Sequence, residues 1–140
     1  MPNFLIQTLT PARLALAREF LRFGTVGFGG FLVDTAVVYG LRSRLGLYGA
    51  GLVSFVAAAS FTWAVNRIWT FRGRGSGALW RQWLHFMAAN ALGFTLNRGA
   101  YFALVALVPL CTTYPVLAIL AGVAAGMFVN FHLSRKLVFR

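Results

Sequence analysis

The stretch "NRIWTFRGRG" (Asn66–Gly75) places three arginines beside an asparagine, a tryptophan and a phenylalanine. A related stretch, "NFHLSRKLVFR", covers Asn130–Arg140. The planar guanidinium of arginine can hold two oxygens of one phosphate group, and tryptophan and phenylalanine suit a membrane–water interface. These stretches therefore predict a site for the phosphate of a lipid headgroup. The alternative is that their arginines serve only membrane topology and general attraction to anionic lipids. The candidate phosphate ligands are Asn66, Arg67, Asn130, Arg135 and Lys136, and the candidate interfacial aromatics are Trp69, Phe71 and Phe139.

A second group of polar residues lies within long apolar runs. Asp34 is the one acidic residue inside such a run, and Arg98 is the one strongly basic residue deep inside another. An ionisable group at that depth costs at least about 2.5–3.5 kcal/mol, so it is paired or functional. Asn90 and Asn97 share one helical stripe with i, i+7 spacing. These four residues could form an intramembrane polar track, although interhelical hydrogen bonds of asparagine often serve packing alone.

The sequence offers no catalytic or metal-binding constellation. It contains two acidic residues and two histidines, with no paired carboxylates for acid–base chemistry and no cluster with metal-ligand spacing. The glycine-rich "GTVGFGG" (Gly24–Gly30) follows no strand, so close helix packing explains it better than dinucleotide binding. We therefore expect a protein that is not an enzyme and that uses no cofactor and no metal.

The composition places these residues in a membrane protein. Hydrophobic residues make up 59% of the chain and charged residues 11%, whereas soluble domains carry about 25% charged residues. The net charge of +11 is not gathered in one stripe, as nucleic-acid binding would require, but lies at the ends of apolar runs. Residues 1–19 do not read as a cleaved signal, because the apolar run that follows is too long.

Four runs are long enough to cross a bilayer as helices, which takes about 20 residues. They are Phe20–Leu41, Leu47–Val65, Trp83–Val108 and Tyr114–Leu133, with Arg42–Gly46 and Pro109–Thr113 as short connections. Residues 1–18 form a separate N-terminal segment, with an interfacial helix from about Pro11. Basic residues cluster in the N-terminal flank, which holds Arg13, Arg18 and Arg22, between the second and third runs, and after the fourth. The positive-inside rule therefore places both termini in the cytoplasm.

The two halves of the transmembrane region, 19–140, resemble each other. "FLRFGTVGFGGFLVDTAVVYGL" (Phe20–Leu41) aligns without gaps with "WLHFMAANALGFTLNRGAYFAL" (Trp83–Leu104), and "RIWTFR" (Arg67–Arg72) aligns with "RKLVFR" (Arg135–Arg140). Each half, about 19–72 and 82–140, contains two predicted spans. The fold expected is therefore an all-α membrane protein in which a two-helix unit is repeated in tandem, with both copies entering the membrane in the same direction.

With the repeat and its basic ends in view, the chain resembles the GtrA-like family of small four-span membrane proteins. The resemblance covers about Glu19–Arg140 and is carried by the first-span motif with Asp34, by "NRIWTFR" and by "NFHLSRKLVFR". It departs from the family pattern at Ser134, where an asparagine often precedes the arginine, and at Leu137, where an aromatic residue is usual. These departures put the equivalence of the two basic ends in doubt.

The resemblance implies a function at the bacterial cytoplasmic membrane. Members of the family are associated with moving polyprenyl-phosphate-linked sugars from the inner to the outer leaflet, for O-antigen, teichoic-acid or cell-wall modification. The partners expected are therefore such a lipid-linked sugar and membrane lipids, and not nucleic acid. Because four short helices enclose little volume, a homodimer or a complex with a membrane glycosyltransferase would complete the path.

Two other functions stay open. A small multidrug exporter has a similar size and number of spans, but it requires an unpaired carboxylate in the membrane, and Arg98 at the depth of Asp34 argues against that. A non-transporting membrane partner of a glycosyltransferase would also carry these motifs.

The equal depth of Asp34 and Arg98 predicts an ion pair between parallel spans. Each lies about 21 Å from the cytoplasmic end at 1.5 Å per residue. Asp34→Arg or Arg98→Asp alone should lower the yield of folded protein, and the double variant should recover it, with a coupling of about 1–3 kcal/mol. Folded yield after detergent extraction measures this. Independent, additive losses would contradict the pair.

Overall fold

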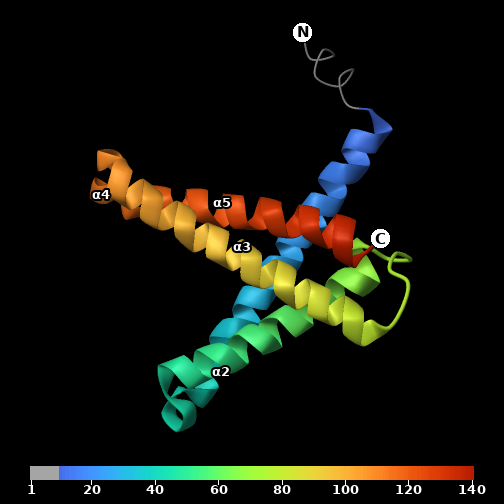
Figure 1. Cartoon of the computed structure of the whole chain (residues 1–140), viewed down its shortest axis with the longest axis horizontal. Coiled ribbons are helices and arrows are strands. Elements are labelled where there is room, and N and C mark those ends of the chain that lie inside the picture. Colours follow the sequence, from blue (N-terminus) through green and yellow to red (C-terminus); the bar gives the residue numbers. More distant parts are fainter. Residues whose placement is uncertain (1–9) are drawn as a thin grey trace. The chain divides into compact units, whose positions relative to one another are not determined.

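The computed structural model describes residues 10–140, apart from the side chains of Pro115 and Val116, and these residues form helices and no strand (Figure 1). The all-α architecture predicted from the sequence is confirmed for them. The chain divides into two compact units, Met1–Gly73 (unit 1) and Arg74–Arg140 (unit 2). The first part of the predicted segment 1–18 lies outside the described residues.

Unit 1 is built from one long helix that folds back on itself. Helix α2 spans Pro11–Val65, and the Thr10 hydroxyl caps its start by accepting from the Arg13 N–H at 3.4 Å. Within it, Gly46 has φ 68° and ψ 174°, a conformation that glycine adopts without steric cost. The two segments on either side of Gly46 therefore run antiparallel (Figure 1). The expected connection Arg42–Gly46 is thus a turn at a single residue, because helix continues up to Leu45.

The two segments of α2 pack through small residues. A Cβ atom added to Gly30 would overlap the methyl group of Thr62, and one added to Gly29 would lie 3.1 Å from the Phe61 ring. Gly30 therefore lets the backbone of the first segment approach the second closely. After Val65 the chain continues as the π-helix η1 (Asn66–Thr70).

Unit 2 is a second helical hairpin. It contains α3 (Leu79–Leu107), the one-turn helix α4 (Pro109–Thr113), α5 (Pro115–Leu133) and the π-helix η2 (Ser134–Val138). Proline starts both α4 and α5, where its missing N–H costs nothing. At the turn, the Thr112 hydroxyl donates to the Val105 carbonyl at 2.8 Å. This bond satisfies a carbonyl that the end of α3 leaves without a helical partner.

Helices α3 and α5 pack against each other at glycines. A Cβ atom on Gly122 would lie 2.7 Å from the Asn97 backbone carbonyl oxygen, and one on Gly126 would lie 3.0 Å from the Gly93 carbonyl oxygen. A Cβ atom on Gly93 would overlap the side-chain amide of Asn130. The two backbones are therefore in direct contact over this stretch, as is typical of helices that pack in a membrane.

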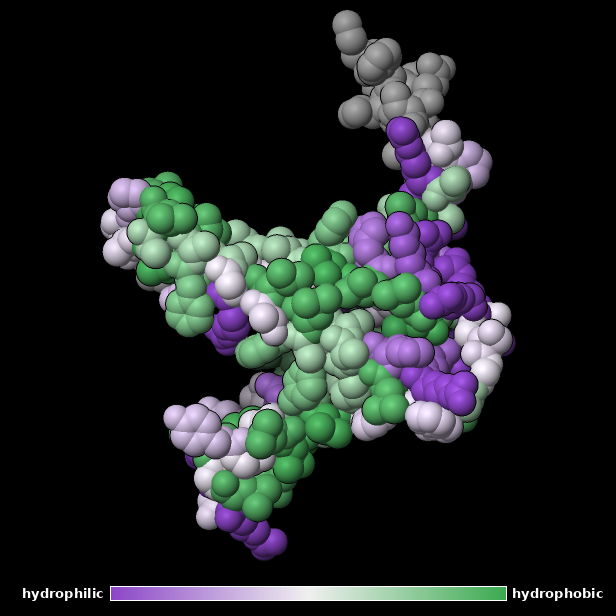
Figure 2. Space-filling model, viewed as in Figure 1, coloured by the Kyte–Doolittle hydropathy of each residue, from purple (hydrophilic) through white to green (hydrophobic). Residues whose placement is uncertain are grey.

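The outward faces of both hairpins are apolar. Figure 2 shows mostly hydrophobic residues along the helices of each unit, and many large apolar side chains are exposed. Hydroxyls on these faces are satisfied within their own helix: Thr25, Thr35 and Thr95 each donate to the carbonyl four residues earlier, at 2.9 Å. A surface of this kind suits lipid, where water cannot satisfy polar groups.

Two of the described helices are long and apolar enough to cross a membrane by length and composition, Pro11–Thr70 and Leu117–Val138. The first includes the turn at Gly46. The number of spans and the cytoplasmic location of the termini stay predictions.

The contact at Gly122 predicts a selective cost for an added methyl group. In Gly122→Ala the Cβ atom meets backbone, which cannot move aside cheaply, so the variant should lose about 1–3 kcal/mol of stability. Unfolding in SDS, followed by circular dichroism, measures this loss. Gly99→Ala on α3 is the control, because nothing lies within 4 Å of its added Cβ atom. Equal stability of the two variants would show that α3 and α5 are not in backbone contact.

Candidate anion-binding ends of the helical hairpins

The π-helix η1 ends the hairpin of unit 1 with a buried polar pair. The Phe71 N–H donates to the Asn66 carbonyl at 2.8 Å, a bond between residues five apart that defines the wider π turn. The Asn66 side chain is 1% exposed, and its amide oxygen accepts from the Thr70 hydroxyl at 2.7 Å. Asn66, a predicted phosphate ligand, is thus buried within its own unit. The sequence interpretation missed Thr70, although its i+4 spacing from Asn66 is a signal for such a pair.

The π-helix η2 ends unit 2 with the same backbone geometry and different side chains. The Phe139 N–H donates to the Ser134 carbonyl at 2.8 Å. Ser134 takes the place of Asn66 in the alignment, and its buried hydroxyl has no partner in the described part of the chain. Gln82 donates from its side-chain amide to the Val138 carbonyl at 3.4 Å, and the Gly75 N–H donates to the Arg140 carbonyl at 2.8 Å. These two contacts fasten η2 to the start of its own unit.

A buried aromatic pair closes each hairpin behind its π turn. The ring centroids of Phe71 and Phe23 lie 6.2 Å apart, and those of Phe139 and Phe86 lie 6.1 Å apart. All four rings are buried. Of the three aromatics predicted for the membrane interface, Trp69 is on the surface, 43% exposed, whereas Phe71 and Phe139 serve the packing of their units.

The basic residues of the two ends differ in exposure. Arg67 and Arg135 occupy the second position of η1 and η2, where both are half-buried and contact other groups of the chain. Lys136 is exposed. In unit 1 the guanidinium of the exposed Arg22 lies over the Trp69 ring, 5.6 Å from its centroid. The sequence indicated Arg22 only as part of the N-terminal basic flank. Its contact with Trp69 was not predictable, because the two residues are 47 positions apart.

Three asparagines of unit 2 are engaged in packing within the unit. The Asn90 amide donates to the Phe86 carbonyl of its own helix at 2.9 Å. Asn97 lies against Gly122 and Gly126 of α5, and Asn130 lies against Gly93 of α3 with its buried amide oxygen unpaired in the described residues. The predicted phosphate ligand Asn130 and one member of the predicted polar track, Asn97, thus lie at the contact of α3 with α5, whereas Asn90 bonds within its own helix.

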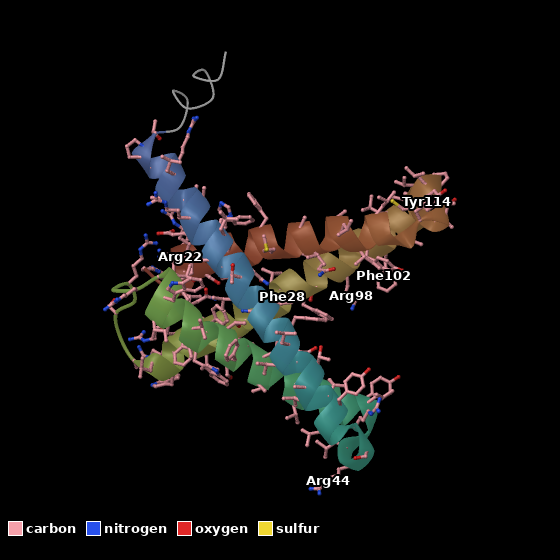
Figure 3. The ribbon with its side chains drawn as sticks, turned by 180° about the vertical axis from the view of Figure 1, so that it is seen from behind. Arg22, Phe28, Arg44, Arg98, Phe102 and Tyr114 are labelled. Carbon is pink, nitrogen blue, oxygen red and sulfur yellow. The ribbon has the colours of Figure 1, made fainter. Side chains whose placement is uncertain are left out.

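Asp34 and Arg98 belong to different units, so their predicted pairing stays a prediction. Asp34 is half-buried on α2. Arg98 is exposed on α3, and its guanidinium lies over the Phe94 ring at 5.4 Å from the centroid (Figure 3). Residues 10–140 contain no group of three His, Cys, Asp or Glu side chains that could hold a metal ion.

Basic stretches that close apolar helices are what the sequence resemblance implied, whereas the π turns within them are a finding of the structure. Comparison with family models tests the resemblance. The model of the GtrA/DPMS transmembrane domain matches residues 22–139. The chain belongs to the GtrA/DPMS transmembrane-domain family. A search of curated proteins gave no match. Membership of this family, together with the apolar helices, supports location in a membrane and a role in handling polyprenyl-phosphate-linked sugars.

The buried pair of η1 predicts that Thr70 contributes to stability. Thr70→Val keeps the shape of the side chain but removes the donor to the Asn66 amide oxygen, so it should cost about 1–3 kcal/mol. Thr25→Val is the control, since its hydroxyl bonds only to its own helix on an exposed face. Chemical unfolding of both variants in detergent measures the difference. A loss no larger than that of Thr25→Val would contradict a stabilising role for the pair.

Proposed function

We propose that this protein moves a polyprenyl-phosphate-linked sugar from the cytoplasmic to the outer leaflet of the bacterial cytoplasmic membrane, for cell-surface polysaccharide or cell-wall glycosylation. The proposed arrangement has four spans in two parallel two-helix units, with both termini in the cytoplasm. The observation that carries the proposal is the match of residues 22–139 to the GtrA/DPMS transmembrane domain. The geometry of the hairpin ends agrees with it.

The phosphate of the lipid would be held by an arginine at one or both of those ends. A phosphodiester lies at headgroup depth and carries negative charge, and arginine binds two of its oxygens in one plane. Arg67 and Arg135 occupy the same position in the two π turns, each four residues before a buried phenylalanine. The prenyl chain could remain in lipid beside the exposed apolar faces of the helices.

The sugar requires polar groups along its path through the hydrocarbon. Because Asn90 donates to its own helix and Asn97 packs on glycines, the amides of α3 contribute less to such a path than the sequence indicated. Asp34 and Arg98 are then the members of the predicted track that we expect to contact the sugar. A homodimer, or a complex with a membrane glycosyltransferase, would provide the additional walls of a path that a small chain cannot enclose.

Flipping of a labelled polyprenyl-phosphate sugar by purified protein in liposomes tests the proposal. Arg67→Gln should weaken binding of the lipid by about tenfold to a hundredfold, since one hydrogen-bonded charged contact is worth roughly 1.5–3 kcal/mol. Arg72→Gln is the matched control, because it removes the same charge from an exposed position five residues away. Protease protection would check that both variants keep their orientation.

Other outcomes of this experiment would overturn the proposal. Lipid movement that requires a glycosyltransferase and is no faster with this protein than without it would make this protein a non-transporting partner of that enzyme. Resistance to cationic drugs conferred on an exporter-deficient host, without lipid flipping, would indicate a small multidrug exporter. If Arg67→Gln lost flipping activity because the protein inserted in the wrong orientation, Arg67 would be a determinant of membrane topology and not a phosphate ligand.

A further inference from the structure

The contact between Arg22 and Trp69 joins the start of the unit 1 hairpin to its π-helical end. Arg22 lies on the first segment of α2, and Trp69 is the fourth residue of η1. The guanidinium sits 5.6 Å from the centroid of the indole ring. Figure 3 shows Arg22 toward the end of this hairpin that lies opposite Arg44, which is near the turn at Gly46. The pair is therefore at the end of unit 1 that η1 closes.

The cation–π contact holds Arg22 at the indole by attraction of its charge to the ring face. The guanidinium carries five N–H donors, which is more than this one contact can occupy. Arg22 is exposed and Trp69 is 43% exposed, so the edge of the guanidinium is open to a ligand. Arg67, in contrast, is half-buried and already contacts other groups. An oriented, accessible fork of donors is suited to a phosphate at headgroup depth.

The aligned positions of unit 2 do not carry this pair. In the alignment of the two halves, His85 stands in the place of Arg22 and Leu137 in the place of Trp69. Its end is instead fastened by the Gln82 side chain on the Val138 carbonyl and by the Gly75 N–H on the Arg140 carbonyl. Gln82 aligns with Glu19, whose side chain has no amide N–H to donate such a bond. The two hairpin ends therefore share a backbone and differ in what they can bind.

We infer that Arg22, oriented by the indole of Trp69, binds the phosphate of the polyprenyl lipid, and that the η1 end of unit 1 is the phosphate-binding end. The η2 end of unit 2 closes its hairpin without binding the phosphate. This inference rests on the proposed function for the identity of the ligand. It adds a residue, Arg22, and a division of roles between the two ends.

Binding of a polyprenyl monophosphate to purified protein in detergent, measured by native mass spectrometry, tests the inference apart from transport. Arg22→Gln should weaken binding roughly tenfold, which corresponds to the loss of one charge-assisted contact. Trp69→Leu, which copies the residue of unit 2, should weaken binding less, because the charge remains but is no longer oriented. Arg22→Lys should fall between wild type and Arg22→Gln, since an ammonium lacks the planar fork.

Arg81→Gln provides the matched control. Arg81 is also exposed and lies over a tryptophan, 5.3 Å from the Trp80 ring, so the variant removes the same charge and the same kind of contact elsewhere. Unchanged binding by Arg81→Gln, with loss in Arg22→Gln, is the expected result. Equal losses in the two variants would overturn the inference, because net charge alone would explain them.

A competition experiment separates the polyprenyl lipid from ordinary anionic lipid. Phosphatidylglycerol at the same mole fraction should not displace the polyprenyl monophosphate; equal displacement would make Arg22 a general headgroup anchor and overturn the inference. Binding that depends on Arg22, without flipping in liposomes, would support this site and contradict the proposed transport. Flipping and binding that are both undiminished in Arg22→Gln would remove the site and leave the proposed function standing.

Discussion

The contact of a glycine with a side chain of the neighbouring helical segment determines how closely the helices of each hairpin approach. Thr62 meets Gly30 in unit 1, and Asn130 meets Gly93 in unit 2. Between two helices in lipid there is no hydrophobic driving force, so backbone approach and polar contacts must select the register. Once that register is set, the end of the returning helix lies beside the start of the first. Phe71 can then pack on Phe23, and Phe139 on Phe86, to close each hairpin.

The π turns follow from the same closure. In a π-helix the backbone bond spans five residues, so the wider turn changes the direction in which the next side chain points. In both units this next residue is a phenylalanine that is buried among the helices. The side chains within the turn of unit 1 then differ in exposure. Arg67 is half-buried, whereas Trp69 lies on the surface, where the guanidinium of Arg22 lies over its ring. The position of the cations at the hairpin ends is thus a result of packing as well as of membrane topology.

The sequence predicted the broad structure well and its local geometry less well. The helical class was predictable from apolar length, and the ends of α2 and α5 at Val65 and Leu133 were predictable from the basic stretches that follow. The turn predicted at Arg42–Gly46 was too long, because the residues before Gly46 continue the helix. Only the positive φ of Gly46 marks the turn, and the sequence does not reveal that angle. Hydrophobic periodicity does not encode a π turn, so the burial of Phe71 and Phe139 was not foreseen.

The contacts of the two asparagines on one stripe of α3 also differ from each other. Asn90 bonds to its own helix, whereas Asn97 packs on Gly122 and Gly126 of α5.

The two aligned halves carry the same residue at three positions where their helices pack closely. Gly30 and Gly93 are identical, as are Phe23 and Phe86, and Phe71 and Phe139, because a larger or smaller side chain at these positions would prevent close approach or leave a cavity. The exposed positions of Trp69 and Leu137 are free of that constraint and carry different chemistry. A lipid-linked sugar with one phosphodiester presents one strongly anionic group, which a single cationic end can hold. A second end of equal affinity would compete for the same group and hinder its release. Unequal ends on similar frames would therefore suit the transport proposed here, and the contrast between Arg22 on Trp69 and His85 with Leu137 is an inequality of that kind.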